Sequence, residues 1–149
     1  MNNDRNTLLK KINIFKEKYA EYKNQNKINE VELNECLCDI LSWIEICIKR
    51  VNLVDEVNNE KLSAIKYANN MKKHSVSIYK YNLNTYALYP SNSLYPSNNL
   101  YPSDFKIFWN KLPLDNIKFN NQYNNYKKHL EGKEILETIE DIYIIIENN

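Results

Sequence analysis

The side chains best suited to acid–base chemistry are the two histidines, His74 and His129. Two histidines can serve as general acid and general base in metal-independent cleavage of a phosphodiester, with a lysine near the phosphate. Here they lie far apart in the chain, and neither belongs to a recognisable catalytic motif. A small metal-independent nuclease that uses His74 and His129 is therefore the alternative interpretation, and surface or helix-capping positions are the simpler one.

Carboxylates recur at helical spacing in two places. One group consists of Glu32, Glu35 and Asp39, and the other of Glu134, Glu137 and Asp141. Each spacing puts the three side chains along one edge of a helix. Di-metal bundles instead carry Glu-x-x-His motifs in the core, and this chain has none. We therefore expect no metal and no cofactor. Two interpretations stay open for both edges: a solvated helix face, which is the simpler one, and a surface that binds a protein partner, which is the functional prediction.

Glycine and cysteine usage removes further chemistry. Gly132 is the only glycine, which excludes Rossmann and Walker phosphate loops and the nucleophile elbow of hydrolases. Cys36, Cys38 and Cys47 are an odd number with no second pair at zinc-ligand spacing. They are typical of reduced thiols that fill a helical core. Since no signal peptide opens the sequence, we expect a cytoplasmic protein. Because none of these catalytic motifs is present, we expect no catalytic residues.

One internal repeat interrupts the chain. Residues 87–104 form three tandem hexapeptides, each with Leu-Tyr-Pro-Ser at its second to fifth positions. Tyr89, Tyr95 and Tyr101 therefore each precede a proline. Proline stops a helix and extends the residue before it, so we expect a long loop over residues 88–103. Two interpretations stay open. The repeat is either a tolerated insertion from slippage in an AT-rich gene, or a loop whose tyrosines contact a partner.

Helical periodicity covers most of the remaining chain. It predicts helices over residues 7–24, 30–52, 55–73, 105–112, 116–130 and 133–147. Asn29 with Glu32 resembles a capping box, Asp55 and Asp115 are cap candidates, and Gly132 fits a left-handed position after a helix. Residues 75–86 fit a strand or a helix equally. We predict one domain, residues 1–149: an all-α bundle of five to six helices, with a short strand or hairpin near 75–86.

Charge is unevenly distributed although the net charge is only +1. Residues 30–60 and 131–149 are acidic, whereas residues 1–29 and 61–130 are basic. Lysine supplies nearly all the positive charge, and the acidic blocks adjoin the basic ones in sequence. This pattern argues against nucleic acid as a partner. No apolar run reaches the length of a membrane span, so we expect no membrane segment.

These features together favour a protein that acts by binding. We predict a non-catalytic inhibitor, such as an immunity protein or antitoxin that neutralises a toxin, for example a nuclease. A phage protein that blocks a host defence is a further alternative. So is a structural or assembly protein whose apolar stretch Ile40–Ile48 packs across subunits. The sequence leaves the partner and the oligomeric state open.

Overall fold

A computed structural model describes residues 2–25, 27–49, 51, 55–81, 106–114 and 116–148. Within these residues the chain folds into five α-helices, a 3-10 turn and a two-stranded antiparallel sheet, which confirms the predicted helical bundle with a short hairpin. The elements are α1 (Asn2–Gln25), α2 (Glu30–Ile48), α3 (Glu56–Lys73), β1 (Tyr79–Tyr81), β2 (Ile107–Trp109), η4 (Ile117–Phe119), α5 (Asn120–His129) and α6 (Ile135–Glu147). The repeat with Tyr89, Tyr95 and Tyr101, and the cap candidate Asp115, lie outside the described residues.

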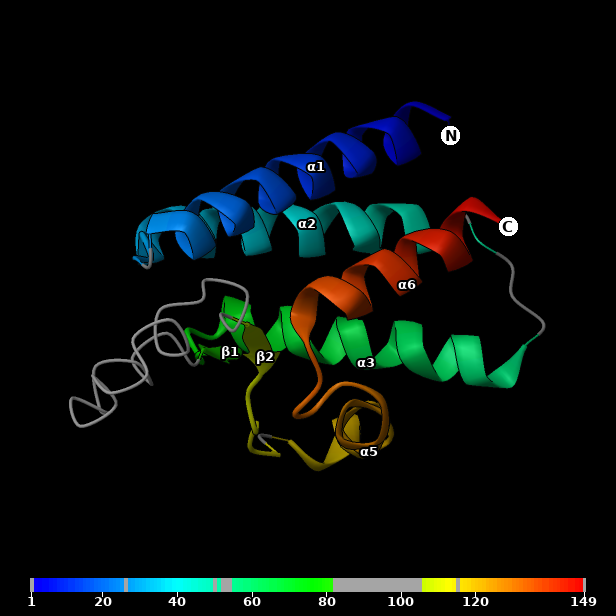
Figure 1. The fold of residues 1–149 in the computed structure, drawn as a ribbon. Coiled ribbons are helices and arrows are strands. Elements are labelled where there is room, and N and C mark those ends of the chain that lie inside the picture. The colour runs from blue at the N-terminus through cyan, green and yellow to red at the C-terminus, as the bar shows by residue number, and fades with distance from the viewer. Residues whose placement is uncertain are drawn as a thin grey trace.

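The helices are arranged around α3 and α6 (Figure 1). α1 and α2 run side by side, α6 lies between this pair and α3, and α5 packs against α3 on the side away from α1. The small sheet adjoins the end of α3, where β1 follows the helix. α6 therefore touches both the α1/α2 pair and α3, and its surroundings determine the candidate site.

Local sequence signals explain where several helices begin and end. The Asn29 side chain accepts a hydrogen bond from the Glu32 backbone N–H at 3.2 Å, and Asp55 accepts one from Asn58 at 3.0 Å. Both are the predicted N-caps, and they satisfy backbone donors that a helix start leaves unpaired. Gly132 has φ +78°, the left-handed conformation that glycine adopts without strain. These predictions are confirmed.

The predicted helix over residues 105–112 is wrong. Residues 107–109 instead form β2, in which Ile107 and Trp109 are fully buried and Phe108 is half-buried. That alternation is the burial pattern of a strand. β2 pairs antiparallel with β1, with Tyr79 opposite Trp109, and Phe108 also forms a bridge to Glu134. The sequence left residues 75–86 open between a strand and a helix. The described part of this stretch contains the strand β1.

Aromatic side chains connect the sheet to the helices. Trp109 is fully buried and meets the Tyr126 ring of α5 edge-on, and Tyr126 in turn lies beside Tyr67 of α3. The hydroxyls of Tyr67 and Tyr126 donate to the carbonyls of Pro113 and Asn110, respectively. The segment between β2 and η4 is therefore held onto α3 and α5 by both apolar contact and hydrogen bonds.

Candidate functional site

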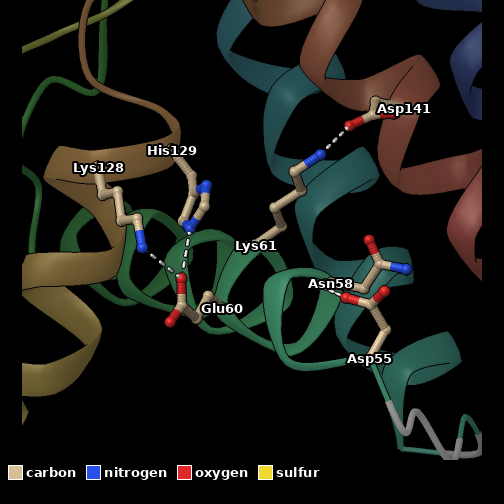
Figure 2. A network of polar contacts seen from close by, with 7 residues as sticks. All are labelled: Asp55, Asn58, Glu60, Lys61, Lys128, His129 and Asp141. Atoms are coloured by element: carbon tan, nitrogen blue, oxygen red, sulfur yellow. Dashed lines mark hydrogen bonds and ion pairs between the residues drawn. The ribbon is translucent and has the colours of Figure 1, made fainter.

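A cavity of about 450 Å³ lies between α3, the C-terminal end of α5 and α6. Its polar lining consists of Thr138 and six ionisable residues, Lys61, His129, Lys133, Glu134, Glu137 and Asp141. The structure thus brings together all three predicted partner-binding residues of the C-terminal acidic edge and one of the two histidines. Figure 2 shows that Lys61, His129 and Asp141 come from three different helices, with Lys61 directed to Asp141 and His129 directed to Glu60.

His129 is held by a carboxylate of α3. Its Nε2 lies 2.7 Å from Glu60 Oε1, and Lys128 Nζ lies 3.2 Å from the same oxygen (Figure 2). The hydrogen bond with His129, followed by that with Lys128, lowers the pKa of Glu60 below its usual 4.5. Only 9% of the His129 side chain is exposed. This cluster fastens the end of α5 to α3, and its member His129 lines the cavity.

The C-terminal acidic edge consists of Glu134, the residue just before α6, and of Glu137 and Asp141 within it, and these acids differ in their partners. Asp141 Oδ2 pairs with Lys61 Nζ at 3.0 Å, and Glu134 accepts a hydrogen bond of 2.6 Å from the Tyr19 hydroxyl of α1. Burial and the bond to Glu134 raise the pKa of Tyr19, which keeps the hydroxyl protonated as the donor. Glu137 and Lys133 form no ion pair with described residues. These two are therefore the charges available to a ligand or partner.

The acidic edge of α2 lies along α1 instead. Glu32 pairs with Lys18 at 3.2 Å and accepts a hydrogen bond from the Tyr22 hydroxyl at 3.0 Å, and Asp39 pairs with Lys11 at 3.5 Å. The Tyr22 hydrogen bond and then Lys18 lower the pKa of Glu32.

Glu35, the third member of this edge, is exposed and makes no ion pair within the described part of the chain. Two of the three predicted partner-binding residues on this edge therefore link α2 to α1.

The two histidines do not share a site. His74 is exposed and caps the C-terminal end of α3, whereas His129 contacts Glu60, fourteen residues earlier in that helix. At about 1.5 Å per residue this places the two contact points roughly 21 Å apart along α3. General acid and base must both reach the reacting group within hydrogen-bond distance. The described arrangement does not provide that for His74 and His129.

Sequence reasoning missed an apolar groove on the other side of α6. It has a volume of about 260 Å³, lies between α1 and α6, and is lined by Leu9, Ile12, Tyr143 and Ile144. Ile144 is 53% exposed and Leu9 36% exposed. The signal was the run of four apolar residues 143–146, because one helix face cannot bury all of them. Lys16 and Glu140, paired at 2.7 Å, border the groove.

The remaining chemical candidates are distributed through the bundle. Cys47 is buried, Cys36 is half-buried with a pKa raised by burial, Cys38 is exposed, and none of the three is in a disulfide. Among the described residues, no three His, Cys, Asp or Glu side chains are grouped to hold a metal ion. No helix in the described ranges is both long and apolar enough to cross a membrane.

Comparison of the chain with protein-family models, with curated proteins and with solved structures finds no match.

Proposed function

We propose that this chain is a non-catalytic inhibitor that acts by binding another protein, in the manner of an immunity protein or antitoxin. The contact surface is the exposed face of α6, formed by Glu137, Asp141 and Ile144 on successive turns, which we call the α6 ridge. The polar cavity lies on one side of this ridge and the apolar groove on the other.

The observation that supports the proposal is the apolar groove beside a charged helix face. Protein interfaces combine a desolvated apolar centre with a polar, hydrated rim. Here Leu9, Tyr143 and Ile144 supply apolar surface that the chain itself leaves exposed or half-buried. The pair Lys16–Glu140 and the acids of the ridge supply the rim. An apolar side chain of a partner that enters the groove would be the anchor of the complex.

Electrostatics narrows the class of partner. α6 carries four acidic residues and no basic one, and although Glu140 and Asp141 each pair with a lysine of a neighbouring helix, Glu137 forms no ion pair with described residues. An acidic helix speeds association with a basic partner by attracting it before contact. Enzymes that act on nucleic acids need a basic substrate surface, because phosphate contacts dominate their affinity. A toxin nuclease therefore has the charge that this ridge requires.

A pair of exposed isoleucines provides the test. Ile144→Asp removes the apolar anchor of the ridge, whereas Ile117→Asp makes the same change on η4, where Ile117 is 82% exposed. Native chain and both variants are immobilised and exposed to lysate of the source organism and to the purified product of the adjacent gene. We expect one stoichiometric partner that the native chain and Ile117→Asp retain and that Ile144→Asp loses.

The charged part of the ridge is tested by association kinetics with that partner. Glu137→Lys and Glu35→Lys change the net charge equally at exposed residues without ion pairs among the described residues. We expect the Glu137 variant to associate about tenfold more slowly and the Glu35 variant to differ little. A partner retained equally by both isoleucine variants, or no partner at all, would overturn the proposal.

No observation favours the alternatives to the same degree. The nuclease alternative needs His74 and His129 together, and the structure separates them. For the assembly alternative, Ile40, Leu41, Ile44, Cys47 and Ile48 are buried inside the bundle. Trp43 and Ile46 of the same stretch are half-buried, so most, but not all, of its apolar surface packs within the chain. A phage anti-defence protein would use the same ridge on a different partner.

A further inference from the structure

The polar cavity between α3, α5 and α6 contains charges of both signs, and most of them already have partners. Lys61 Nζ pairs with Asp141 Oδ2 at 3.0 Å, and His129 Nε2 lies 2.7 Å from Glu60 Oε1 (Figure 2). Glu134 accepts a hydrogen bond of 2.6 Å from a tyrosine hydroxyl of α1. Because these contacts join α6 to α3 and α1, and α5 to α3, they hold the walls of the cavity together.

Two charged residues of the lining remain available to a ligand. Lys133 and Glu137 both line the cavity and are both exposed. Neither forms an ion pair with the other or with any other described residue. They carry opposite charges. Because both border one cavity, a single small molecule can contact both.

The backbone holds Lys133 in place beside the start of α6. Its N–H donates to the carbonyl of Leu130 at 2.9 Å, and its carbonyl accepts a hydrogen bond of 2.9 Å from the N–H of Trp109. The preceding residue, Gly132, has φ +78° and donates to the carbonyl of Trp109 at 3.0 Å. The turn that carries this lysine is therefore fixed to β2, and only the side chain has to move to meet a ligand.

The start of α6 favours a negative group. Glu134, the N-cap residue, forms no side-chain hydrogen bond to the helix, and its carboxylate is bonded to α1 instead. The N–H groups in the first turn of a helix attract anions. Lys133 adds a full positive charge at this end, whereas Glu137 presents a negative charge within the first turn. The cavity thus offers a position for an anion and, one turn away, a position for a cation.

We propose that the polar cavity binds a free amino acid with an aliphatic side chain. The ligand carboxylate contacts Lys133, its ammonium group contacts Glu137, and its side chain lies toward the buried apolar residues of the lining, Leu130 and Ile142. The cavity volume of about 450 Å³ falls within the range of roughly 300–1,000 Å³ that is typical of small-molecule sites. A ligand with only one charge would leave either Lys133 or Glu137 unmatched.

This inference does not depend on the proposed inhibitor function, because it concerns the chain alone with a small molecule. Glu137 belongs to both surfaces, whereas Lys133 lies outside the α6 ridge. Failure of the ligand test would therefore leave the capture of a partner by the ridge as it stands, and loss of the partner would leave the ligand site as it stands.

The test follows the backbone amides of the isotope-labelled chain by nuclear magnetic resonance during titration with three related compounds. L-Norleucine carries both charges on a straight aliphatic chain, pentylamine lacks the carboxylate, and hexanoate lacks the ammonium group. We expect saturable shifts at residues 130–138 with norleucine and a dissociation constant on the order of 1 mM, as is usual for so small a ligand. Each compound with a single charge should bind about fivefold more weakly, which is the upper range for one exposed ion pair.

Two pairs of variants assign the charges. Lys133→Met and Glu137→Gln each remove one charge of the cavity, and Lys10→Met and Glu35→Gln remove the same charges from exposed residues outside the lining. Each cavity variant should bind norleucine about fivefold more weakly than the native chain. Lys133→Met should not weaken the binding of pentylamine, and Glu137→Gln should not weaken that of hexanoate. Both controls should bind norleucine as the native chain does, and circular dichroism verifies that all four variants keep the native fold.

Three results would overturn the proposal. The first is the absence of saturable shifts at residues 130–138 with norleucine. The second is equal affinity for norleucine and for pentylamine or hexanoate, which would make the cavity a site for a single charge. The third is an equal loss in the cavity variants and in their controls, which would reduce the effect to net charge.

Discussion

The two acidic edges look alike in sequence, yet the fold gives them different surroundings. On α2, Glu32 and Asp39 pair with Lys18 and Lys11 of the neighbouring helix α1. On α6, Glu134 is tied to α1, whereas Glu137 and Asp141 stand on an exposed ridge between a polar cavity and an apolar groove. Carboxylates at helical spacing therefore identify an edge, and the neighbouring helix determines whether it closes the bundle or faces outward.

Two tyrosines of α1 connect the edges to the same helix. Tyr19 donates to Glu134 at 2.6 Å, and Tyr22, three residues later, donates to Glu32 at 3.0 Å. Burial, and then the hydrogen bond to the respective glutamate, raise the pKa of each tyrosine. α1 thus fixes α2 and α6 by similar contacts, and the difference between the edges arises farther along each helix.

The largest difference in stability is expected between substitutions on the two faces of α6. Ile142 is fully buried, whereas Ile144 is 53% exposed. Ile142→Ala should lower the free energy of unfolding by about 3 kcal/mol, because it removes buried methyl groups and leaves a cavity. Ile144→Ala should change it by less than about 0.5 kcal/mol. Urea unfolding measures both, and similar losses in the two variants would show that Ile144 packs inside the bundle and that α6 has no free ridge.

A smaller effect should distinguish the two tyrosines. Tyr19→Phe removes the shorter bond to a half-buried carboxylate and should cost about 2 kcal/mol, and Tyr22→Phe about 1 kcal/mol. Each substitution keeps the ring, so apolar packing is unchanged. Urea unfolding of the single variants and of the double variant also shows whether the losses add, as independent contacts should. A larger loss for Tyr22 would indicate that the α2 edge is the more tightly held one.

The sequence predicted those parts of the fold that depend on neighbouring residues. The Asn29 and Asp55 caps and the long periodic helices follow from contacts within a few positions. The helix prediction was wrong for residues 107–109 because the conformation of this segment depends on distant partners. These partners are Lys80, opposite Phe108 in the sheet, and Glu134, which forms the bridge to Phe108. Its own apolar spacing suits a helix as well as a strand, and only the partner strand decides between them.

The candidate site was predictable to the same extent. The α6 carboxylates could be placed on one edge from their spacing, but their partners Lys61 and Tyr19 are 80 and 115 residues away. The contact of His129 with Glu60 spans 69 residues. No local pattern encodes such pairs, since they arise from how α3, α5 and α6 pack. The same packing exposes Ile144 and creates the apolar groove.

The smallest effect is expected in how the stability that the α2 edge provides depends on pH. Because the folded state lowers the pKa of Glu32 below its usual 4.5, the ionised carboxylate stabilises the fold above that pH, and this contribution is lost as the pH falls through the lowered value. Glu32→Gln should therefore be less stable than the native chain at neutral pH. The difference should shrink steadily as the pH falls below 4.5. Urea unfolding across this range measures it.

Glu35→Gln is the matched control, because Glu35 lies on the same edge, is exposed and makes no ion pair with described residues. Its unfolding free energy should follow that of the native chain at every pH. A Glu32 difference that stays constant with pH would mean that the side chain acts through packing rather than charge. The lysine pairs of the α2 edge would then contribute nothing, and Glu32 and Asp39 would be as available to a partner as the acids of the α6 ridge.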